Sequence, residues 1–192
     1  MVFNPKQLVI LCLSLFSFSA FCGEVIQSHV SYNKGIYKAS FEMQIQAPLT
    51  EVYALFTDFN HLSRLSKNIT DSLLLEENPP EYIVEVDSHN CILFFCKNLT
   101  QTQYVLEFDE GYISVEDIEG IEGIEGKSDF IFANTVWHIR TFKNGTRVTF
   151  SAEMKPDFWL PPVLGPWLFK NKMISDTRKM IERLEQLASD KQ

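Results

Sequence analysis

The sequence contains few of the residues that mark metal, cofactor and nucleophilic sites. Only four of its 192 residues are cysteine and four are histidine. The histidines lie on separate segments, with no His-Glu-x-x-His helix, no Cys-x-x-Cys pair and no nucleophile elbow. No glycine-rich phosphate loop follows a strand-like segment. We therefore expect no catalytic constellation, no metal site and no cofactor.

Positive charge is also scarce. The chain has 17 Lys and Arg residues against 25 Asp and Glu residues, for a formal net charge of −8. Proteins that bind nucleic acid neutralise phosphates with clustered Lys and Arg. The only basic residues close together here are mixed with acidic ones near the C-terminus. Nucleic acid is therefore excluded as an expected partner.

Long apolar runs are absent except near the N-terminus. Lys6 precedes an apolar run at 8–18, and Ala20 and Cys22 place small residues at −3 and −1 before Gly23. The run is short for a membrane span. We expect residues 1–22 to be a cleaved signal peptide of a bacterial periplasmic or secreted protein, with an uncleaved anchor as the alternative. Residues 23–192 are expected to form a single domain.

The last fifth of the chain predicts one long helix. A stiff lead-in contains Pro161, Pro162 and Gly165, and Pro166 suits a first helical turn. Beyond it, apolar and charged residues alternate with helical periodicity. The apolar positions are Trp167, Met173, Ile174, Thr177, Met180, Ile181, Leu184 and Ala188. This amphipathic helix of about six turns needs a sheet to cover its apolar face.

Most of the chain before that helix resembles strands. Residues 24–34 are polar and are interpreted as a lead-in, whereas apolar residues at every second position from Tyr37 to Ala47 predict the first strand. Two short helices should follow, one at 49–57 and one capped by Asp58. Further strands are expected at 72–76, 82–86, 100–108, 112–116, 130–142 and 147–154.

Turns between these strands are short. Pro79-Pro80, Asp109-Glu110-Gly111 and Asn144-Gly145 are turn signals, and short turns join antiparallel neighbours. Three tandem Ile-Glu-Gly units at 118–126 are too few for a repeat architecture and indicate a flexible acidic loop. The predicted class is α+β, with an antiparallel sheet followed by a long helix.

This order of elements resembles the START-like or SRPBCC superfamily, and more narrowly its bacterial polyketide cyclase/dehydrase and coenzyme Q-binding START-like group. The resemblance covers roughly residues 34–188. It is carried by APLTEVYALFTDFNHLSRL at 47–65, SDFIFANTVWHIR at 128–140 and GTRVTFSAEMKPDFWLPPVLGP at 145–166. It implies the helix-grip fold, in which a curved sheet wraps around the C-terminal helix. It also implies an apolar cavity for lipids, quinones or polyketides.

Strand parity and helical spacing select the residues that would line such a cavity. They are Phe41, Met43, Trp137 and Phe150 on the sheet and Met173, Ile174 and Thr177 on the helix. The apolar segment before the helix adds Trp159 and Leu164 at an expected cavity mouth, opposite a second apolar cluster at 92–95. Periodicity alone does not distinguish a hollow core from a filled one, so a packed core is the alternative.

Cys91 and Cys96 are the only cysteines beyond residue 22. In a straight strand their Cα atoms would lie roughly 16 Å apart, whereas a disulfide needs about 4.4–6.8 Å. A bridge requires the chain to reverse at 92–95, and apolar residues are poor turn formers. The residues leave both states open. The superfamily resemblance places a strand connection nearby, which favours a disulfide-bridged hairpin tip.

These observations favour binding over catalysis. The inward positions are nearly all apolar, with Thr135 and Thr177 as the exceptions. We expect a carrier or sensor of a hydrophobic small molecule that contacts a membrane or donor protein transiently during loading. A cyclase or dehydratase acting on such a ligand, and a protein-interaction module without a ligand, are the alternatives.

Overall fold

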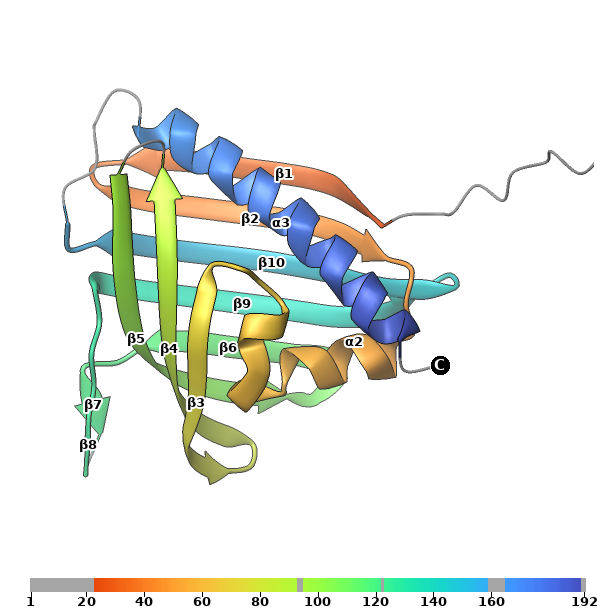
Figure 1. Ribbon diagram of the computed structural model, residues 1–192, viewed down its shortest axis with the longest axis horizontal. Helices are drawn as coiled ribbons and strands as arrows, with labels where there is room; N and C mark the ends of the chain where they lie inside the picture. The colour runs from red at the N-terminus through yellow and green to blue at the C-terminus, as the bar shows by residue number, and fades with distance from the viewer. Residues whose placement is uncertain (1–22, 93–94, 122, 159–164, 191–192) are drawn as a thin grey trace, which may run out of the picture.

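The computed structural model describes residues 23–92, 95–121, 123–158 and 165–190. An eight-stranded sheet curves around one long helix, α3 (Figure 1). The strand order is β1-β2-β10-β9-β6-β5-β4-β3, and every neighbouring pair is antiparallel. The sheet strands are β1 (Glu24–Asn33), β2 (Ile36–Ile45), β3 (Ile69–Asn78), β4 (Glu81–Ile92), β5 (Phe95–Phe108), β6 (Tyr112–Asp117), β9 (Phe130–Phe142) and β10 (Gly145–Pro156). The remaining elements are α2 (Leu49–Phe56), η1 (Phe59–Arg64), η2 (Asp109–Gly111), β7 (Gly120–Ile121), β8 (Ile124–Glu125) and α3 (Gly165–Ser189).

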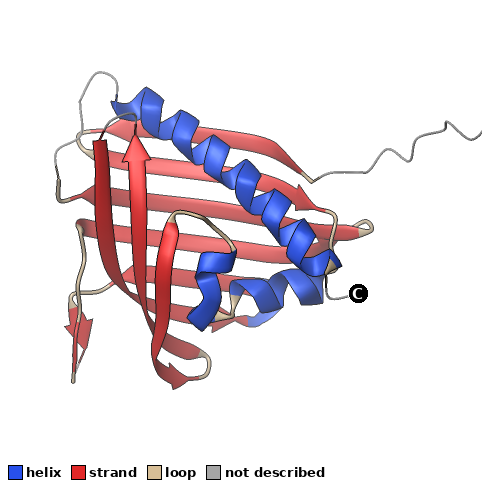
Figure 2. Ribbon diagram, viewed as in Figure 1, coloured by secondary structure: helices blue, strands red, loops and turns tan. Residues whose placement is uncertain are grey.

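The α+β class and the helix-grip arrangement are confirmed. Figure 2 shows α2, η1 and α3 together on the concave face of the sheet, with α3 lying obliquely across several strands. The predicted C-terminal helix is present with 25 residues, and its buried residues include Thr177, Ile181 and Leu184. In the described ranges, no helix combines the length and the apolar character needed to cross a membrane.

Period-two patterning correctly predicts the central strands. The alternating residues from Tyr37 to Ala47 are all at most 4% exposed. β10 pairs with β2 so that Phe150 lies opposite Phe41, and it buries Val148 and Ala152 on the same face. Because alternate side chains of a strand point to opposite faces, this pattern determines which residues reach the interior.

The expected polar lead-in at 24–34 is wrong, because it forms the edge strand β1. This strand pairs with β2 through a tight turn at Lys34 and Gly35, whose φ angles are 49° and 87°. Its side chains are mostly exposed, so they carry little apolar alternation. Backbone hydrogen bonds hold an edge strand whatever its side chains are. The two short helices therefore follow the second strand and not the first.

The helix α2 agrees with expectation, whereas the second short helix is a 3₁₀ helix, η1, kinked at His61. The expected capping role of Asp58 is wrong, since its side chain makes no cap hydrogen bond. Its oxygens instead contact His61 Nδ1 at 2.7 Å and pair with the Arg64 guanidinium. The Asp58 carboxylate therefore connects the residue before η1 to His61 in the middle of this helix and to Arg64 at its end.

Two strand-level expectations need correction, and the expected β9–β10 hairpin is confirmed with its turn one residue earlier. β4 and β5 run well beyond the expected ends at 86 and 100, because the polar residues at 87–90 continue the ladder without apolar alternation. The Ile-Glu-Gly repeats, predicted to be a flexible acidic loop, contain a small hairpin, β7–β8. At the β9–β10 turn, Lys143 and Asn144 form the connection. Gly145 begins β10, where an added Cβ would lie 2.3 Å from the Ile45 carbonyl oxygen.

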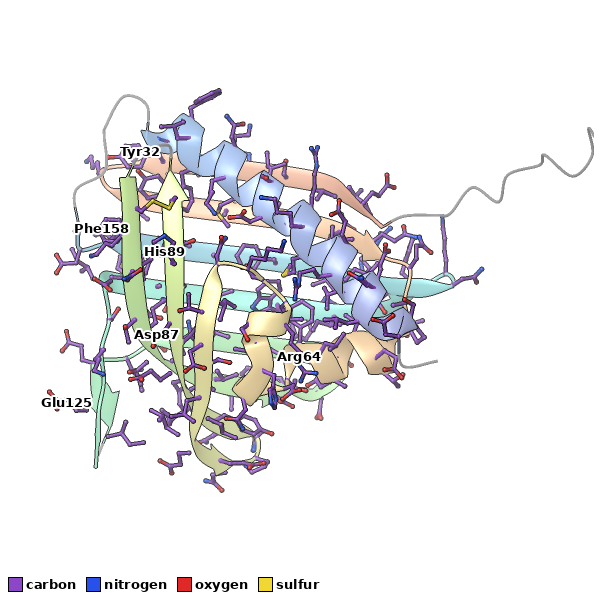
Figure 3. The ribbon with its side chains drawn as sticks, in the orientation of Figure 1. Tyr32, Arg64, Asp87, His89, Glu125 and Phe158 are labelled. Carbon is purple, nitrogen blue, oxygen red and sulfur yellow. A yellow bond between two sulfur atoms is a disulfide. The ribbon has the colours of Figure 1, made fainter. Side chains whose placement is uncertain are left out.

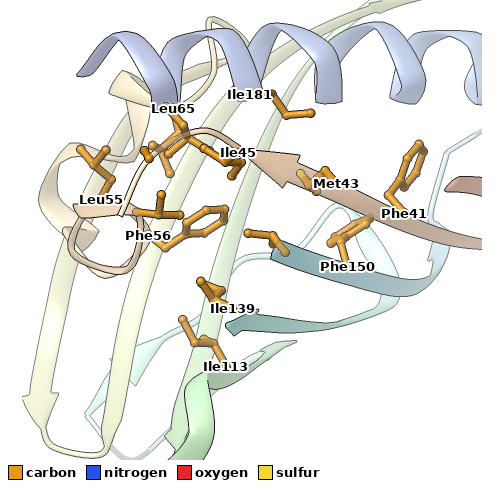
Figure 4. Close-up of a cluster of buried hydrophobic side chains, with 14 of the residues drawn as sticks. Phe41, Met43, Ile45, Leu55, Phe56, Leu65, Ile113, Ile139, Phe150 and Ile181 are labelled. Atoms are coloured by element: carbon orange, nitrogen blue, oxygen red, sulfur yellow. The ribbon is translucent and has the colours of Figure 1, made fainter. Parts of the chain in front are cut away.

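The core is fully packed at the end of the sheet that α2 and η1 cover. Val52, Leu55 and Phe56 of α2 lie beneath α3 and are buried. Figure 4 shows Ile181 of α3 above Ile45, with Ile113 and Ile139 deeper in the same cluster. These side chains contribute buried apolar surface, on which stability depends.

Candidate functional site

The other end of the concave face is hollow. A cavity of about 510 Å³ lies between the sheet and the N-terminal half of α3. Most of its wall is apolar and comes from five strands and the helix. The large apolar side chains are Met43, Leu99, Phe130, Trp137, Phe150, Met154, Phe158, Phe169, Met173 and Met180. A cavity of this size and composition is typical of a site for one small molecule.

A row of aromatic rings separates the packed end from the hollow end. Phe56 of α2 lies 5.0 Å from Trp137, and Trp137 lies 4.4 Å from Phe150, measured between ring centroids. Trp137 and Phe150 line the cavity, whereas Phe56 belongs to the packed core. The cavity therefore begins where the cover provided by α2 ends.

The structure brings five of the nine predicted ligand-binding residues together in the cavity wall: Met43, Trp137, Phe150, Met173 and Thr177. Phe41 does not line it, because its ring is completely buried beside Phe150 at a centroid distance of 6.0 Å. Ile174 packs against the hydrophobic core instead. The predicted mouth residues Trp159 and Leu164 lie outside the described residues, as do the side chains at 92–95.

Polar residues in the wall are the feature that the sequence interpretation missed. They come from β4, β5, α3 and the segment after η1, and they comprise Ser66, Ser88, Asn90, Lys97, Gln101, Lys172 and Asp176. Thr135, which was expected to be one of two polar residues facing the interior, is half-buried and does not line the cavity. Because the expected strands ended at 86 and began again at 100, the inward positions 88, 90 and 97 were overlooked. Continuing the two strands by parity would have identified them.

One cluster of polar side chains lies on and beside the β4–β5 hairpin. Lys97 Nζ lies 2.6 Å from Asp129 Oδ1, and Asp129 Oδ2 accepts a hydrogen bond from the Thr100 amide at 3.1 Å. The same ammonium lies 4.2 Å from the centre of the Phe158 ring. Asn90 is the cross-strand partner of Lys97. The charge is thus held at the cavity wall by a carboxylate that is itself anchored to the backbone.

A second cluster of polar side chains lies on and beside α3. Lys172 pairs with Asp176 one helical turn later, and Asn68 Nδ2 donates a hydrogen bond to Asp176 Oδ2 at 2.8 Å. Lys179 Nζ also lies 3.8 Å from Asp176 Oδ1. One carboxylate is therefore shared by two lysines and an amide.

Asp117 of β6 is a partly buried carboxyl close to the cavity. Burial raises the pKa of this carboxyl, and hydrogen bonds, first among them that from Gln101, partly oppose the change. Gln101 Nε2 donates to both carboxylate oxygens at 2.8 Å, and Ser128 Oγ donates to one of them at 2.8 Å. Because Gln101 lines the cavity, Asp117 stands one side chain behind its wall.

The structure contains a disulfide between Cys91 and Cys96, which occupy directly opposite positions of β4 and β5 with Cα atoms 4.0 Å apart. The bond is drawn in yellow near the labelled His89 (Figure 3). His89 Nε2 lies 3.3 Å from Cys91 Sγ, and His89 Nδ1 lies 2.6 Å from Asn98 Oδ1. The three groups are close enough to hold a metal ion. However, metal binding by cysteine requires a thiolate, and these sulfurs are bonded to each other.

Comparison with known proteins places this architecture in a family. The sequence profile of polyketide cyclase / dehydrase and lipid transport proteins matches residues 45–184. None of the curated proteins matches the chain in sequence.

Several solved structures share the fold. An aromatase/cyclase, Zhui, from Streptomyces sp. R1128 superposes with a TM-score of 0.63 at 11% identity, over 81% of this chain and 95% of that one. A STAR-related lipid transfer protein from Xanthomonas axonopodis gives 0.61 at 15% identity, over 83% and 99%. Human StAR-related lipid transfer protein 5 gives 0.61 at 12% identity, over 97% and 95%. At these identities the likeness shows the fold alone.

The profile match spans the sheet from the end of β2, the two short helices and most of α3, which are the elements that enclose the cavity. The chain therefore belongs to the polyketide cyclase / dehydrase and lipid transport family.

Proposed function

We propose that this protein binds a hydrophobic small molecule of the lipid, quinone or polyketide class in the cavity under α3, and carries it without transforming it. The observation that supports this most directly is the cavity itself, with a volume of about 510 Å³ and a mainly apolar wall. An apolar cavity left empty forfeits packing contacts and stability. Burial of an apolar ligand restores those contacts.

Loading is proposed to occur at the end of the cavity between the β4–β5 tip and the start of α3. Cys96 and Phe158 line the cavity at this end. Trp167, in the first turn of α3, is 64% exposed. Tryptophan is favoured where one end of a side chain is apolar and the other wet, as at membrane and protein interfaces. A transient contact with a membrane or a donor protein would use this end.

Organic extraction of the natively purified protein, followed by mass spectrometry, tests the proposal. We expect one apolar compound at close to one molecule per chain. Binding of a fluorescent long-chain probe by extracted protein provides the independent measurement. Protein that carries no apolar compound and takes up no probe would contradict ligand binding and favour a protein-interaction module.

A catalytic role is the second candidate, and Asp117 is the observation that favours it. A carboxyl whose pKa is raised by burial can act as a general acid, and Gln101 connects this one to the cavity wall. If the protein is a cyclase or dehydratase, Asp117→Asn should abolish turnover of a polyketide-type substrate while probe binding is retained. Unchanged turnover in this variant would remove Asp117 from any mechanism.

We also propose that the protein is exported and that residues 1–22 are removed. The apolar run at 8–18 and the small residues before Gly23 support this, as does the Cys91–Cys96 disulfide, because such bonds persist in oxidising compartments. Intact-mass measurement of protein from the periplasm should show a chain beginning at Gly23. A species that retains residues 1–22 would refute cleavage.

A further inference from the structure

We propose that the polar part of the cavity wall binds an anionic head group, so that the natural ligand is a single-chain amphipath ending in a carboxylate or a phosphate. This inference rests on the proposed function and narrows the class of ligand. It follows from the position of two lysines, from the balance of charge around them and from the neutral groups nearby.

The two lysines enter the cavity wall from different elements. Lys97 belongs to β5 and Lys172 to α3, and both line the cavity. Their side chains are 40% and 23% exposed, compared with 60–64% for the ion-paired Lys38, Lys127 and Lys179. A lysine ammonium is strongly hydrated and normally remains in water. Two lysines with partly buried side chains in a mainly apolar wall are therefore unusual for a site that binds only hydrocarbon.

The carboxylates nearby cancel only part of this positive charge. Among the described residues that line the cavity, Asp176 is the only acidic one, against two lysines. It is also contacted by Lys179 and by the Asn68 amide. Asp129, the partner of Lys97, is not part of the wall, and its second oxygen is occupied by the Thr100 amide. Counted with their partners, the three ammonium groups of Lys97, Lys172 and Lys179 meet the two carboxylates of Asp129 and Asp176. One positive charge therefore remains unbalanced beside the wall, in a chain whose net charge is −8.

Neutral hydrogen-bonding groups accompany the lysines. Ser88 and Asn90 share the inner face of β4 beside Lys97, and Asn90 Nδ2 donates to Ser88 Oγ at 3.0 Å. An ammonium has three donors. Lys97 directs one to Asp129 and faces the Phe158 ring. A wholly apolar ligand that displaced water from these groups would leave donors unpaired, which is costly. An anionic head would satisfy them while its chain contacts the methionines and aromatic rings.

The volume indicates a single chain. A cavity of about 510 Å³ lies in the middle of the range for sites that enclose one drug-sized molecule. A head at the polar wall and one chain directed toward Trp137 and Phe150 would use both parts of the cavity. A two-chain phospholipid would leave much of its apolar surface in water.

The test compares two probes that differ only in the head group. The affinity of purified, extracted protein for cis-parinaric acid and for its methyl ester would be measured by fluorescence titration. We expect the acid to bind at least about tenfold more tightly, the size of one hydrogen bond to a charged group. Lys97→Met and Lys172→Met should each remove most of this preference, measured as the ratio of acid affinity to ester affinity in the same variant.

Lys170→Met is the matched control, because Lys170 lies on the same helix, is exposed and does not line the cavity. It should retain the full acid preference. Lys172→Arg preserves the charge and should retain most of it. Thermal melts identify any variant that is not folded. If Lys172→Met does not fold, Lys172→Arg is the variant whose acid preference is measured at this position.

Competition experiments distinguish a carboxylate head group from a phosphate head group. Hexadecanoate and hexadecyl phosphate should both displace the probe, with the better competitor identifying the head group, whereas hexadecanol should be at least about tenfold weaker. Equal binding of acid and ester, with hexadecanol as effective as hexadecanoate, would overturn the anionic head and leave the proposed function intact. Failure of every probe to bind would overturn both.

Discussion

The two ends of the concave face use the same strands and reach opposite results. At one end, Ile45 of β2 and Ile139 of β9 are at most 1% exposed beneath α2 and the C-terminal half of α3. At the other end, Trp137 of β9 and Met154 of β10 remain partly exposed around a cavity. The difference comes from the cover, since α2 and η1 fill only the first end. Inward-facing apolar residues are therefore necessary for a packed core but do not by themselves produce one.

The two ends of the concave face are therefore expected to have different roles, one in stability and the other in binding. Close-packed side chains gain both the hydrophobic contribution and dispersion contacts. Side chains that line a cavity have partners on one side only. We expect the packed end to hold the fold together and the hollow end to tolerate substitution at the expense of binding.

The largest expected effect is at the packed end. Leu184→Ala should destabilise the protein by about 2–5 kcal/mol, because Leu184 is fully buried and its truncation leaves a void. Met173→Ala, on the same helix but in the cavity wall, should cost less than about 1 kcal/mol, since it leaves no new enclosed void. Urea unfolding of both variants measures the difference. Equal losses would contradict the division between the two ends.

Removal of the disulfide should have the next largest effect. Replacement of Cys91 and Cys96 by serine should lower the free energy of unfolding by about 2 kcal/mol, the value for a short closed loop. The hairpin tip lies at the hollow end, where covalent linkage substitutes for packing. Thiol labelling of the native, unreduced protein is the control. Two reactive thiols, or serine variants as stable as the parent, would contradict the prediction.

Filling the cavity should reduce binding without reducing stability. Met173→Trp places a larger side chain in the wall and should weaken probe binding by about tenfold or more. The melting temperature should change little, because the added volume enters empty space. The same substitution at Ile174, which packs against the core, is the matched control and should destabilise the protein by overpacking. Unchanged probe binding in Met173→Trp would place the ligand elsewhere.

The smallest expected effect is the contribution of Asp117 to the pH dependence of stability. Burial raises the pKa of Asp117 in the folded protein above the value of about 3.9 expected in the unfolded chain. The stability that depends on its proton is therefore fully present below pH about 4 and is lost as the pH rises through the folded pKa. Asp117→Asn lacks this loss, so the stability of the variant relative to the parent should increase between about pH 4 and pH 7.

Denaturant unfolding of parent and variant at several pH values checks this prediction. A constant difference across that range, or a change of the opposite sign, would contradict it. Asp176→Asn at the cavity wall is not a suitable control, because it also removes the partner of Lys172. Asp190→Asn, at an exposed position just after α3, is the control for the effect of an aspartate-to-asparagine replacement.

The sequence by itself determined the elements whose side chains alternate strongly. Period-two burial in β2 and β10, the helical stripe of α3 and the turn residues at Pro79 and Gly111 are local signals, and each predicts its element correctly. Their order was sufficient to identify the superfamily and the helix-grip fold. Met43, Trp137 and Phe150 followed from parity alone as residues of the inner face.

The tertiary structure decided what had no local signal. β1 is held by backbone pairing to β2, and β4 and β5 continue through polar residues in a backbone ladder that also contains the Cys91–Cys96 bond. This extension brings Lys97 into the same cavity wall as Lys172, which is 75 positions away in the chain. Whether the inner face is filled or hollow also depends on how far α2 reaches across it. Periodicity reports which way a side chain points, and only the folded chain determines what it meets there.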